Sequence, residues 1–254
     1  MQAERAAEQI WRAHRNRERF ANLSGDLAPA SVDEAYDVQE AFHRLAQPSL
    51  GPIGGLKIAT TTKVMQALMG IDHPCGGAIF QSRIYSSPAT IDRAPYVNLR
   101  LECEIAVKLA RDLPPREVSI EEAMAAVGGI APAFELIEDR HADYRDTKAT
   151  SLIADNAWNG GVVHGAWRPF DPARGAGDVE GVLTFNGKKQ GHGRPDDPFS
   201  ALAWVANLAA KRGRPMKAGM IIITGSLIPT FDPPPGVDIV FAIEGLGEAR
   251  ARVG

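Results

Sequence analysis

Leu101-Glu102-Cys103-Glu104-Ile105-Ala106 lies inside an alternation of apolar residues that runs from Tyr96 to Leu109. This alternation predicts a β-strand, in which successive side chains point to opposite faces. One face then carries Leu101, Cys103, Ile105, Val107 and Leu109. The other face carries Glu102 and Glu104, two like charges that repel each other and resist ionisation on a mostly buried strand. A cation between them would relieve the repulsion, and oxygen ligands favour a hard metal such as Mg²⁺ or Mn²⁺.

The alternative for the E-x-E pattern is a solvated strand face, and a short motif alone does not exclude it. A second acidic stretch, residues 131–140 (APAFELIEDR), favours the metal hypothesis. There Glu135 lies between Phe134 and Leu136, where an unpaired charge would be costly. We therefore expect Glu135 to come from a neighbouring strand and to complete a site of three carboxylates, with open positions for substrate or water.

Composition limits the possible functions of the chain. Its 254 residues are 44% hydrophobic, enough for one large domain or one domain with a small appendage, and its net charge is −3. We expect no nucleic-acid surface, because no basic patch is evident. Neither a run of 18 apolar residues nor a signal-peptide pattern is present, so we expect no membrane span and a cytoplasmic location. Cys75 and Cys103 are far apart in the sequence and fit a reducing compartment.

The order of the predicted elements indicates an α+β fold with mixed or antiparallel sheets, not a doubly wound parallel sheet. Helical periodicity predicts a helix over residues 3–20, and Ser31 with Glu34 predicts the start of a second helix that ends near Ala46. We interpret residues 1–50 as a helical N-terminal lead-in and residues 51–254 as the catalytic domain. Strands dominate this second part, and Asn186-Gly187 predicts a type I′ hairpin turn.

Three other segments carry candidate functional residues. Lys57 lies in an apolar strand, where a lysine either extends its amine to solvent or pairs with a negative group. Asp155 and Asn156 follow an apolar run and could instead be an ordinary cap or turn. Thr224-Gly225-Ser226 at a predicted strand end could bind a carboxylate, although a plain strand-to-loop turn is the simpler interpretation.

Together these segments resemble the 2-keto-4-pentenoate hydratases of the fumarylacetoacetate hydrolase superfamily. Residues 55–66 (GLKIATTTKVMQ) resemble the family's G-x-K-I-G-x-T motif, and residues 101–106 resemble its E-x-E-I-A motif. Residues 132–140 resemble P-A-x-E-I-x-D-S-R, residues 154–157 resemble D-N-A, and residues 224–226 resemble a late T-G-S. The matches follow the family's order from about residue 35 to about residue 247.

The resemblance implies a mixed β-sandwich roll with peripheral helices. It implies Mg²⁺ or Mn²⁺ held by Glu102, Glu104 and Glu135, Lys57 as a catalytic group, and Asp155, Asn156, Thr224, Gly225 and Ser226 near the substrate. The expected activity is a metal-dependent hydratase of 2-hydroxy-2,4-dienoates from the meta-cleavage of aromatic compounds. Alternatives are a decarboxylase of 2-oxo-3-enedioates, an acylpyruvate-type hydrolase, or a non-catalytic partner subunit. The resemblance also implies a homo-oligomer and an association with a pathway decarboxylase or hydratase.

Two positions depart from the family's pattern. Cys75 stands where an acid usually follows the proline of the G-[IV]-D-x-P-D motif, and Trp158 stands where the D-N-A segment usually continues with serine. A neutral thiol cannot supply the acid, so we expect nearby Asp72 or His73 to serve the water-addition step, and we favour His73 because imidazole is the side-chain type best suited to proton transfer at neutral pH. Trp158 would narrow the pocket or change which dienoate fits.

Overall fold

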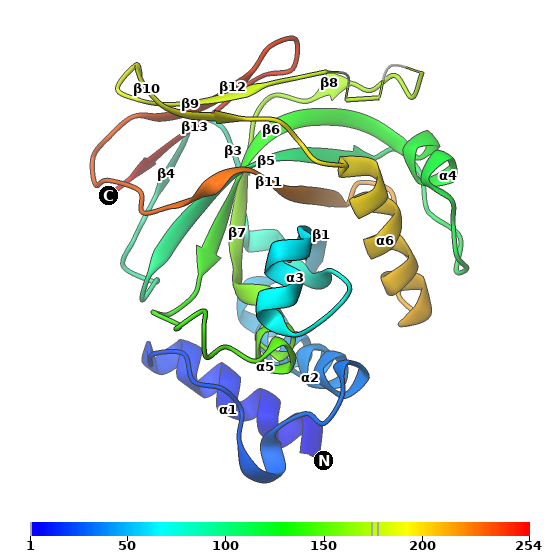
Figure 1. Cartoon of the computed structure of the whole chain (residues 1–254), viewed down its shortest axis with the longest axis vertical. Coiled ribbons are helices and arrows are strands. Elements are labelled where there is room, and N and C mark those ends of the chain that lie inside the picture. Colours follow the sequence, from blue (N-terminus) through cyan, green and yellow to red (C-terminus); the bar gives the residue numbers. More distant parts are fainter. Residues whose placement is uncertain (1, 174, 177) are drawn as a thin grey trace.

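The computed structural model describes residues 2–173, 175–176 and 178–254. A strongly curved, mixed β-structure forms its centre, and helices lie below it and to one side (Figure 1). The helices are α1 (Gln2–Asn16), α2 (Val32–Leu50), α3 (Lys63–Met69), α4 (Ile120–Ala125), α5 (Ala149–Ala154) and α6 (Pro198–Lys211), with 3-10 turns η1 (Gly25–Leu27), η2 (Gln81–Arg83) and η3 (Asn156–Trp158). None of the described helices combines the length and the apolar character needed to cross a bilayer.

Within the described residues, the larger sheet has eight strands in the order β2-β1-β11-β5-β6-β7-β3, and the short strand β8 pairs with β6. Its strands are β1 (Ile53–Ala59), β2 (Cys75–Phe80), β3 (Ile84–Ser86), β5 (Leu99–Leu109), β6 (Val127–Glu138), β7 (Asn159–His164), β8 (Arg168–Pro169) and β11 (Ile221–Phe231). β1 pairs in parallel with β11 and β3 with β7, whereas the other pairs are antiparallel. The expected α+β class with mixed sheets is confirmed.

The smaller sheet has five strands in the order β10-β9-β12-β13-β4 among the described residues. Its strands are β4 (Ala89–Ile91), β9 (Gly181–Phe185), β10 (Lys188–Gly193), β12 (Ile239–Ile243) and β13 (Gly247–Val253). The hairpin between β9 and β10 turns at Asn186 and Gly187, both with positive φ as a type I′ turn requires.

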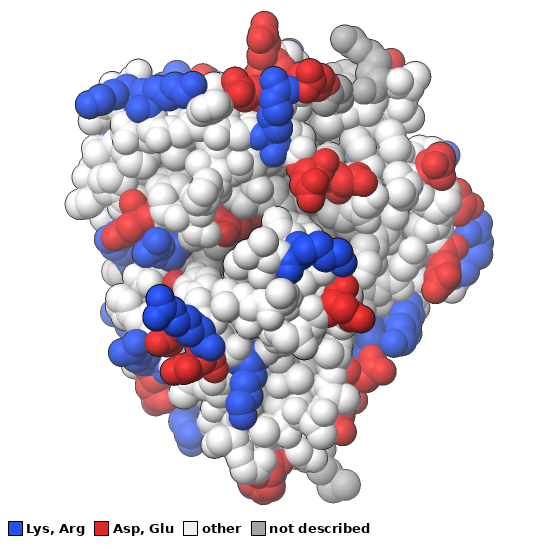
Figure 2. All heavy atoms as spheres, viewed as in Figure 1, with Lys and Arg blue, Asp and Glu red and all other residues white. Residues whose placement is uncertain are grey.

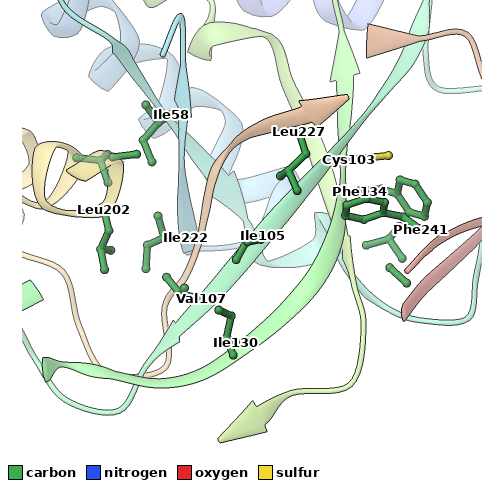
Figure 3. Close-up of a cluster of buried hydrophobic side chains, with 14 of the residues drawn as sticks. Ile58, Cys103, Ile105, Val107, Ile130, Phe134, Leu202, Ile222, Leu227 and Phe241 are labelled. Carbon is green, nitrogen blue, oxygen red and sulfur yellow. The ribbon is translucent and has the colours of Figure 1, made fainter. Parts of the chain in front are cut away.

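The main core lies between the two sheets and under α6. The apolar face of β5 is entirely buried in it, as its alternation predicted, and Phe134 of β6 meets Phe241 of β12 at 6.1 Å between ring centroids (Figure 3). Burial of these side chains on one face fixes the register of β5, because a slip by one residue would turn them outward. The same register therefore directs Glu102 and Glu104 to the opposite face.

The N-terminal helices form their own apolar cluster against the sheet. Ile10 of α1 and Phe42 of α2 pack together with Phe80 of β2 and Ala154 of α5. Ser31 caps α2 as expected, but the helix ends at Leu50 instead of near Ala46. Pro48 is tolerated in its last turn, and the amide of Gly51 closes that turn on the carbonyl of Gln47. The division of the chain at residue 50 stays a prediction.

Charges are interspersed on the molecular surface. On the face of Figure 2, acidic and basic side chains alternate without a large region of one sign. Many are paired, as in Arg116 with Glu122 and Lys217 with Asp112. Such exposed pairs contribute little to stability, and the described residues on the face of Figure 2 form no basic stripe.

Candidate metal centre and active site

Three carboxylates converge on the concave face of the larger sheet. Glu102 and Glu104 come from β5, and Glu135 comes from β6, where it lies directly opposite Glu102 in the strand register. One oxygen of each carboxylate lies within 4.8 Å of the others. Glu104 and Glu135 are completely buried. The three predicted ligands are therefore brought together by the pairing of two adjacent strands.

Each carboxylate is held through one oxygen by a separate donor. The amide of Gly225 donates to Oε2 of Glu104 at 2.7 Å, and Nδ2 of Asn159 donates to Oε1 of Glu135 at 2.9 Å. The hydroxyl of Thr230 donates to Glu102. The second oxygens of Glu104 and Glu135 are buried with no hydrogen-bond partner.

Buried carboxylate oxygens without partners are expensive, so a cluster of this kind is suited to a cation. Burial, together with the charge of Glu135, raises the pKa of Glu102 and raises that of Glu104 well above its usual range. Oxygen atoms alone, each carboxylate oriented by a hydrogen-bond donor behind it, fit a hard divalent metal. The residues present therefore fit the metal that the sequence implied.

Lys57 of β1 lies beside this cluster. Its side chain is buried, and Nζ lies 3.0 Å from Oε1 of Glu135. Burial alone lowers its pKa, but the neighbouring charges of Glu135, Glu102 and Glu104 outweigh burial and raise it. Of the two interpretations of Lys57, solvent exposure and pairing, the structure supports pairing. The charges of the carboxylates thus favour the protonated form of the amine.

The segment 224–226 lies inside a strand and not at a strand end. β11 continues to Phe231, and its register with β5 shifts around Ser226 as in a β-bulge. Gly225 takes φ +113°, where a Cβ would lie 3.2 Å from the side chain of Thr61. Bulges often re-aim groups beside active sites. Here the bulge directs the amide of Gly225 to Glu104, while the hydroxyl of Thr224 is used on the carbonyl of Ile105.

A cavity of about 540 Å³ opens at Glu102, the partly exposed member of the carboxylate cluster. Lys57 and Glu102 line it, and so do Gly225 and Ser226 of the bulge. This volume lies within the range of about 300–1,000 Å³ that is typical of small-molecule sites. The described structure thus joins a carboxylate cluster, a charged amine and a pocket of substrate size.

Comparison with known proteins agrees with this geometry. The family model of the fumarylacetoacetate (FAA) hydrolase C-terminal domain matches residues 71–254. The chain belongs to the fumarylacetoacetate hydrolase family. It is 30% identical to the 2-keto-4-pentenoate hydratase of Paraburkholderia xenovorans LB400 over 99% of this chain and 94% of that protein. It is also 30% identical to the 4-oxalocrotonate decarboxylase of a Pseudomonas species, over 97% of this chain and 96% of that protein.

Solved structures support the same family assignment. The 4-oxalocrotonate decarboxylase of Pseudomonas putida G7 matches with a TM-score of 0.89 and 26% identity, over 100% of this chain and 97% of that one. It has been solved with calcium and acetate and with magnesium and adipate. The fumarylpyruvate hydrolase of Pseudomonas aeruginosa shares the fold, with a TM-score of 0.58 and 17% identity, over 78% of this chain and 88% of that one. The expected β-sandwich roll of this superfamily is therefore confirmed.

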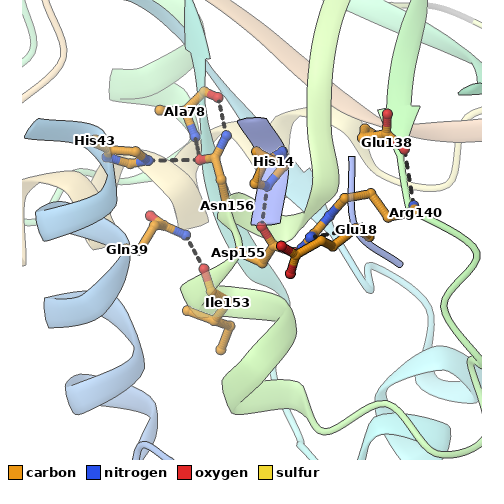
Figure 4. Close-up of polar contacts among 10 residues, drawn as sticks. All are labelled: His14, Glu18, Gln39, His43, Ala78, Glu138, Arg140, Ile153, Asp155 and Asn156. Carbon is orange, nitrogen blue, oxygen red and sulfur yellow. Dashed lines mark hydrogen bonds and ion pairs between the residues drawn. The ribbon is translucent and has the colours of Figure 1, made fainter. Parts of the chain in front are cut away.

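The family's D-N-A segment does not present its polar side chains to the cavity. Asp155 pairs with Arg140 and with His14 of α1, while Asn156 bonds both backbone groups of Ala78 and the ring of His43 (Figure 4). Direct contact of Asp155 or Asn156 with a substrate, as the resemblance implied, is therefore not supported by their placement. Both side chains hold the turn.

The same turn delivers Trp158 to the cavity. Asn156, Ala157 and Trp158 have φ of +55°, +46° and +57°, a left-handed run that non-glycine residues seldom adopt. The ion pairs of Asp155 and the hydrogen bonds of Asn156 hold this strained run in place. Ala157 and Trp158 line the cavity as a result. The departure at Trp158 thus changes the pocket wall itself.

His73 and Cys75 lie around the edge of the site. Nδ1 of His73 lies 2.7 Å from the carbonyl of Pro74, its ring stacks near Trp204, and it is outside the cavity lining. Cys75 is a fully buried free thiol, and burial raises its pKa. The catalytic role of His73 stays a prediction.

Two site residues, Asn159 and Thr230, escaped the sequence interpretation. Both donate to carboxylates of the three-glutamate cluster. Asn159 directly follows Trp158, and Thr230 lies four residues after Ser226, so their proximity to the recognised motifs was the available signal. The sequence distance from either residue to its carboxylate gives no indication of the contact, because both contacts join different strands of the sheet.

Proposed function

We propose that this protein is a metal-dependent lyase that hydrates 2-hydroxy-2,4-dienoates, with Mg²⁺ or Mn²⁺ as its metal. The observation that carries the proposal is the set of three carboxylates with Lys57 at the cavity. The chain's 30% identity to 2-keto-4-pentenoate hydratases over nearly its whole length supports the choice of reaction. Intact ligands and a buried charged lysine argue against a non-catalytic partner subunit.

In this proposal Glu102, Glu104 and Glu135 hold the metal. A bound divalent cation supplies Lewis-acid stabilisation for negative charge on the substrate's oxygens. Lys57, protonated beside Glu135, stabilises the charge that develops at the 2-oxygen and exchanges a proton there. Protonation at the far end of the dienol gives a 2-oxo-3-enoate, and addition of water at C4 gives a 4-hydroxy-2-oxo acid. Every atom of the water remains in the product.

The second candidate is decarboxylation of a 2-oxo-3-enedioate on the same scaffold. It is favoured by the 0.89 TM-score to a 4-oxalocrotonate decarboxylase. One experiment separates the two reactions. The purified chain with Mg²⁺ or Mn²⁺ is given 2-hydroxypenta-2,4-dienoate and, separately, 4-oxalocrotonate; dienol absorbance, 4-hydroxy-2-oxo acid and released CO₂ are measured. Hydrated product without CO₂ supports the proposal, whereas CO₂ release from 4-oxalocrotonate with no hydration of the dienoate refutes it.

The remaining expectations concern the protein's surroundings. We infer a homo-oligomer, a cytoplasmic location, and an association with a pathway decarboxylase or hydratase from the family alone. Light scattering on the purified chain tests the first, and co-purification from a native host tests the association.

A further inference from the structure

The cavity has a polar part and a large apolar part. Of the described residues that line it, two are charged, Lys57 and Glu102, and Lys57 is already paired with Glu135. Beyond them, hydroxyl side chains lie along one part of the lining (Thr60, Thr61, Thr62, Ser226 and Thr230). The rest of the wall is apolar and includes Met65, Leu68 and Met69 of α3, Ile137 of β6, Leu152 of α5, and Trp158. On the side of β11 the lining continues with Leu227, Ile228 and Pro229.

Two aromatic side chains of this wall carry a polar tip: the hydroxyl of Tyr144 has a partner outside the cavity, and the indole Nε1 of Trp158 is buried without a hydrogen-bond partner. Tyr144 lines the cavity, but its hydroxyl donates to Oδ2 of Asp139 at 3.1 Å. Trp158 packs edge-on against Tyr144 and Phe20, each at 5.2 Å between centroids. Its indole Nε1 is buried from solvent, so the ring presents carbon to the cavity. The wall therefore offers a ligand dispersion contacts and little hydrogen bonding.

A second carboxylate on the substrate would need a cation here. Arg100 lies on the same face of β5 as Glu102, opposite Ile137 in the register, and its Nε is buried without a partner. Arg100 is nevertheless outside the cavity lining. A carboxylate placed against the apolar wall would lose its hydration without gaining an ion pair, which is strongly unfavourable.

The volume of the cavity exceeds what a five-carbon dienoate fills. We propose that the cavity selects 2-oxo or 2-hydroxydienoic acids whose far carbon carries an uncharged apolar chain longer than methyl, and that it disfavours a second carboxylate. The placement of the substrate's carboxylate and 2-oxygen at the carboxylate cluster rests on the proposed function. The preference for an apolar chain at the far carbon rests on the apolar wall alone.

Binding of stable 2-oxo acids tests this preference without requiring turnover. The full chain with Mn²⁺ is titrated in a calorimeter with 2-oxopentanoate, 2-oxooctanoate and 2-oxoadipate. Because each buried methylene contributes about a fourfold gain in affinity, we expect 2-oxooctanoate to bind at least about tenfold more tightly than 2-oxopentanoate. We expect 2-oxoadipate to bind more weakly than 2-oxopentanoate. Equal affinities, tighter binding of 2-oxoadipate, or no binding of any acid overturns the inference.

Two variants of α3 link the preference to the wall. Met65 lines the cavity, whereas Val64 on the same helix is 78% exposed and does not line it. We expect Met65→Ala to weaken 2-oxooctanoate binding about tenfold and to leave 2-oxopentanoate within about twofold. Val64→Ala should change neither, and equal effects of the two variants contradict the inference.

The two proposals fail in different ways. A preference for the long apolar acid without hydration of any dienoate upholds this inference and refutes the proposed reaction. Hydration combined with tighter binding of 2-oxoadipate refutes this inference alone. In that case Arg100→Gln should remove the tighter binding of the dicarboxylate, which would identify Arg100 as the group that receives it.

Discussion

The donors behind the carboxylates provide the sharpest test of the metal centre. Asn159→Ala removes the donor to Oε1 of Glu135, and Thr230→Val removes the donor to Glu102. Each change deletes one hydrogen bond and leaves every carboxylate in the chain. Asn159→Ala affects Glu135, which is fully buried. Thr230→Val affects Glu102, which is partly exposed, so water can replace the lost hydrogen bond.

The magnitude follows from the charge on the acceptor. A hydrogen bond to a charged group contributes about 1.5–3 kcal/mol, and a metal ligand that loses its donor becomes more basic and less well oriented. Loss of such donors lowers metal affinity by about 10–100-fold, which corresponds to about 1.4–2.7 kcal/mol. We expect Asn159→Ala to weaken Mn²⁺ binding within this range and Thr230→Val to weaken it by about tenfold or less.

Calorimetric titration of the purified variants with Mn²⁺ measures the effect. Thr224→Val is the matched control, because its hydroxyl donates to the backbone of Ile105 and not to a carboxylate. The control should keep Mn²⁺ affinity within about twofold, although it loses some stability. Wild-type affinity in a folded Asn159→Ala protein, or an equal loss in Thr224→Val, would refute the reasoning.

Four further outcomes are expected. Glu102→Gln and Glu135→Gln abolish Mn²⁺-dependent turnover in folded protein, as calorimetry and circular dichroism would reveal. Lys57→Met lowers kcat at least about a hundredfold while Mn²⁺ still binds. Burial lowers the pKa of His43 to about 4, so the unfolded chain binds more protons than the folded chain between about pH 4 and 6.5. As the pH falls through that window, the free energy of unfolding of the wild type, measured with urea, decreases by about 3 kcal/mol. The His43→Gln variant lacks this decrease. His73→Ala slows hydrated-product formation but spares enol loss. If both rates fall together, His73 is structural or binds substrate; if neither changes, this loop does not carry the water chemistry, which favours the decarboxylase or hydrolase alternative.

Strand periodicity and burial were enough to predict the carboxylate cluster. The alternation around Glu102 and Glu104 fixed which face each side chain occupies, and the apolar neighbours of Glu135 indicated a buried charge in need of a partner. These are properties of a strand and of its immediate neighbours, so they are readable in one sequence. The cap at Ser31 and the hairpin at Asn186 are local in the same sense.

Contacts across the chain could not be predicted in the same way. Whether Lys57 pairs with Glu135 depends on the register of β1 against β11 and of β11 against β5. The predicted strand end at Thr224 was wrong because bulged pairing with β5 carries β11 onward, past a glycine whose local pattern resembles a turn. Tertiary pairing overrides local turn signals of this kind.

The buried ion pair of Asp155 illustrates how polar residues can shape an apolar wall. Asp155, Arg140 and their surroundings are desolvated, and burying such charges is costly even when they are paired. This free-energy cost has a structural use, because Asp155 fixes the start of the left-handed run at residues 156–158. Without that anchor the three residues would return to more favourable backbone angles. Asn156, bonded to both backbone groups of Ala78, fixes the next position against β2. These bonds fix the backbone conformation of the turn, and that conformation places the ring of Trp158 at the cavity. The polar network of Figure 4 therefore shapes the cavity wall through the position of an indole, and in the proposed selection of apolar substrates it acts without touching the substrate itself.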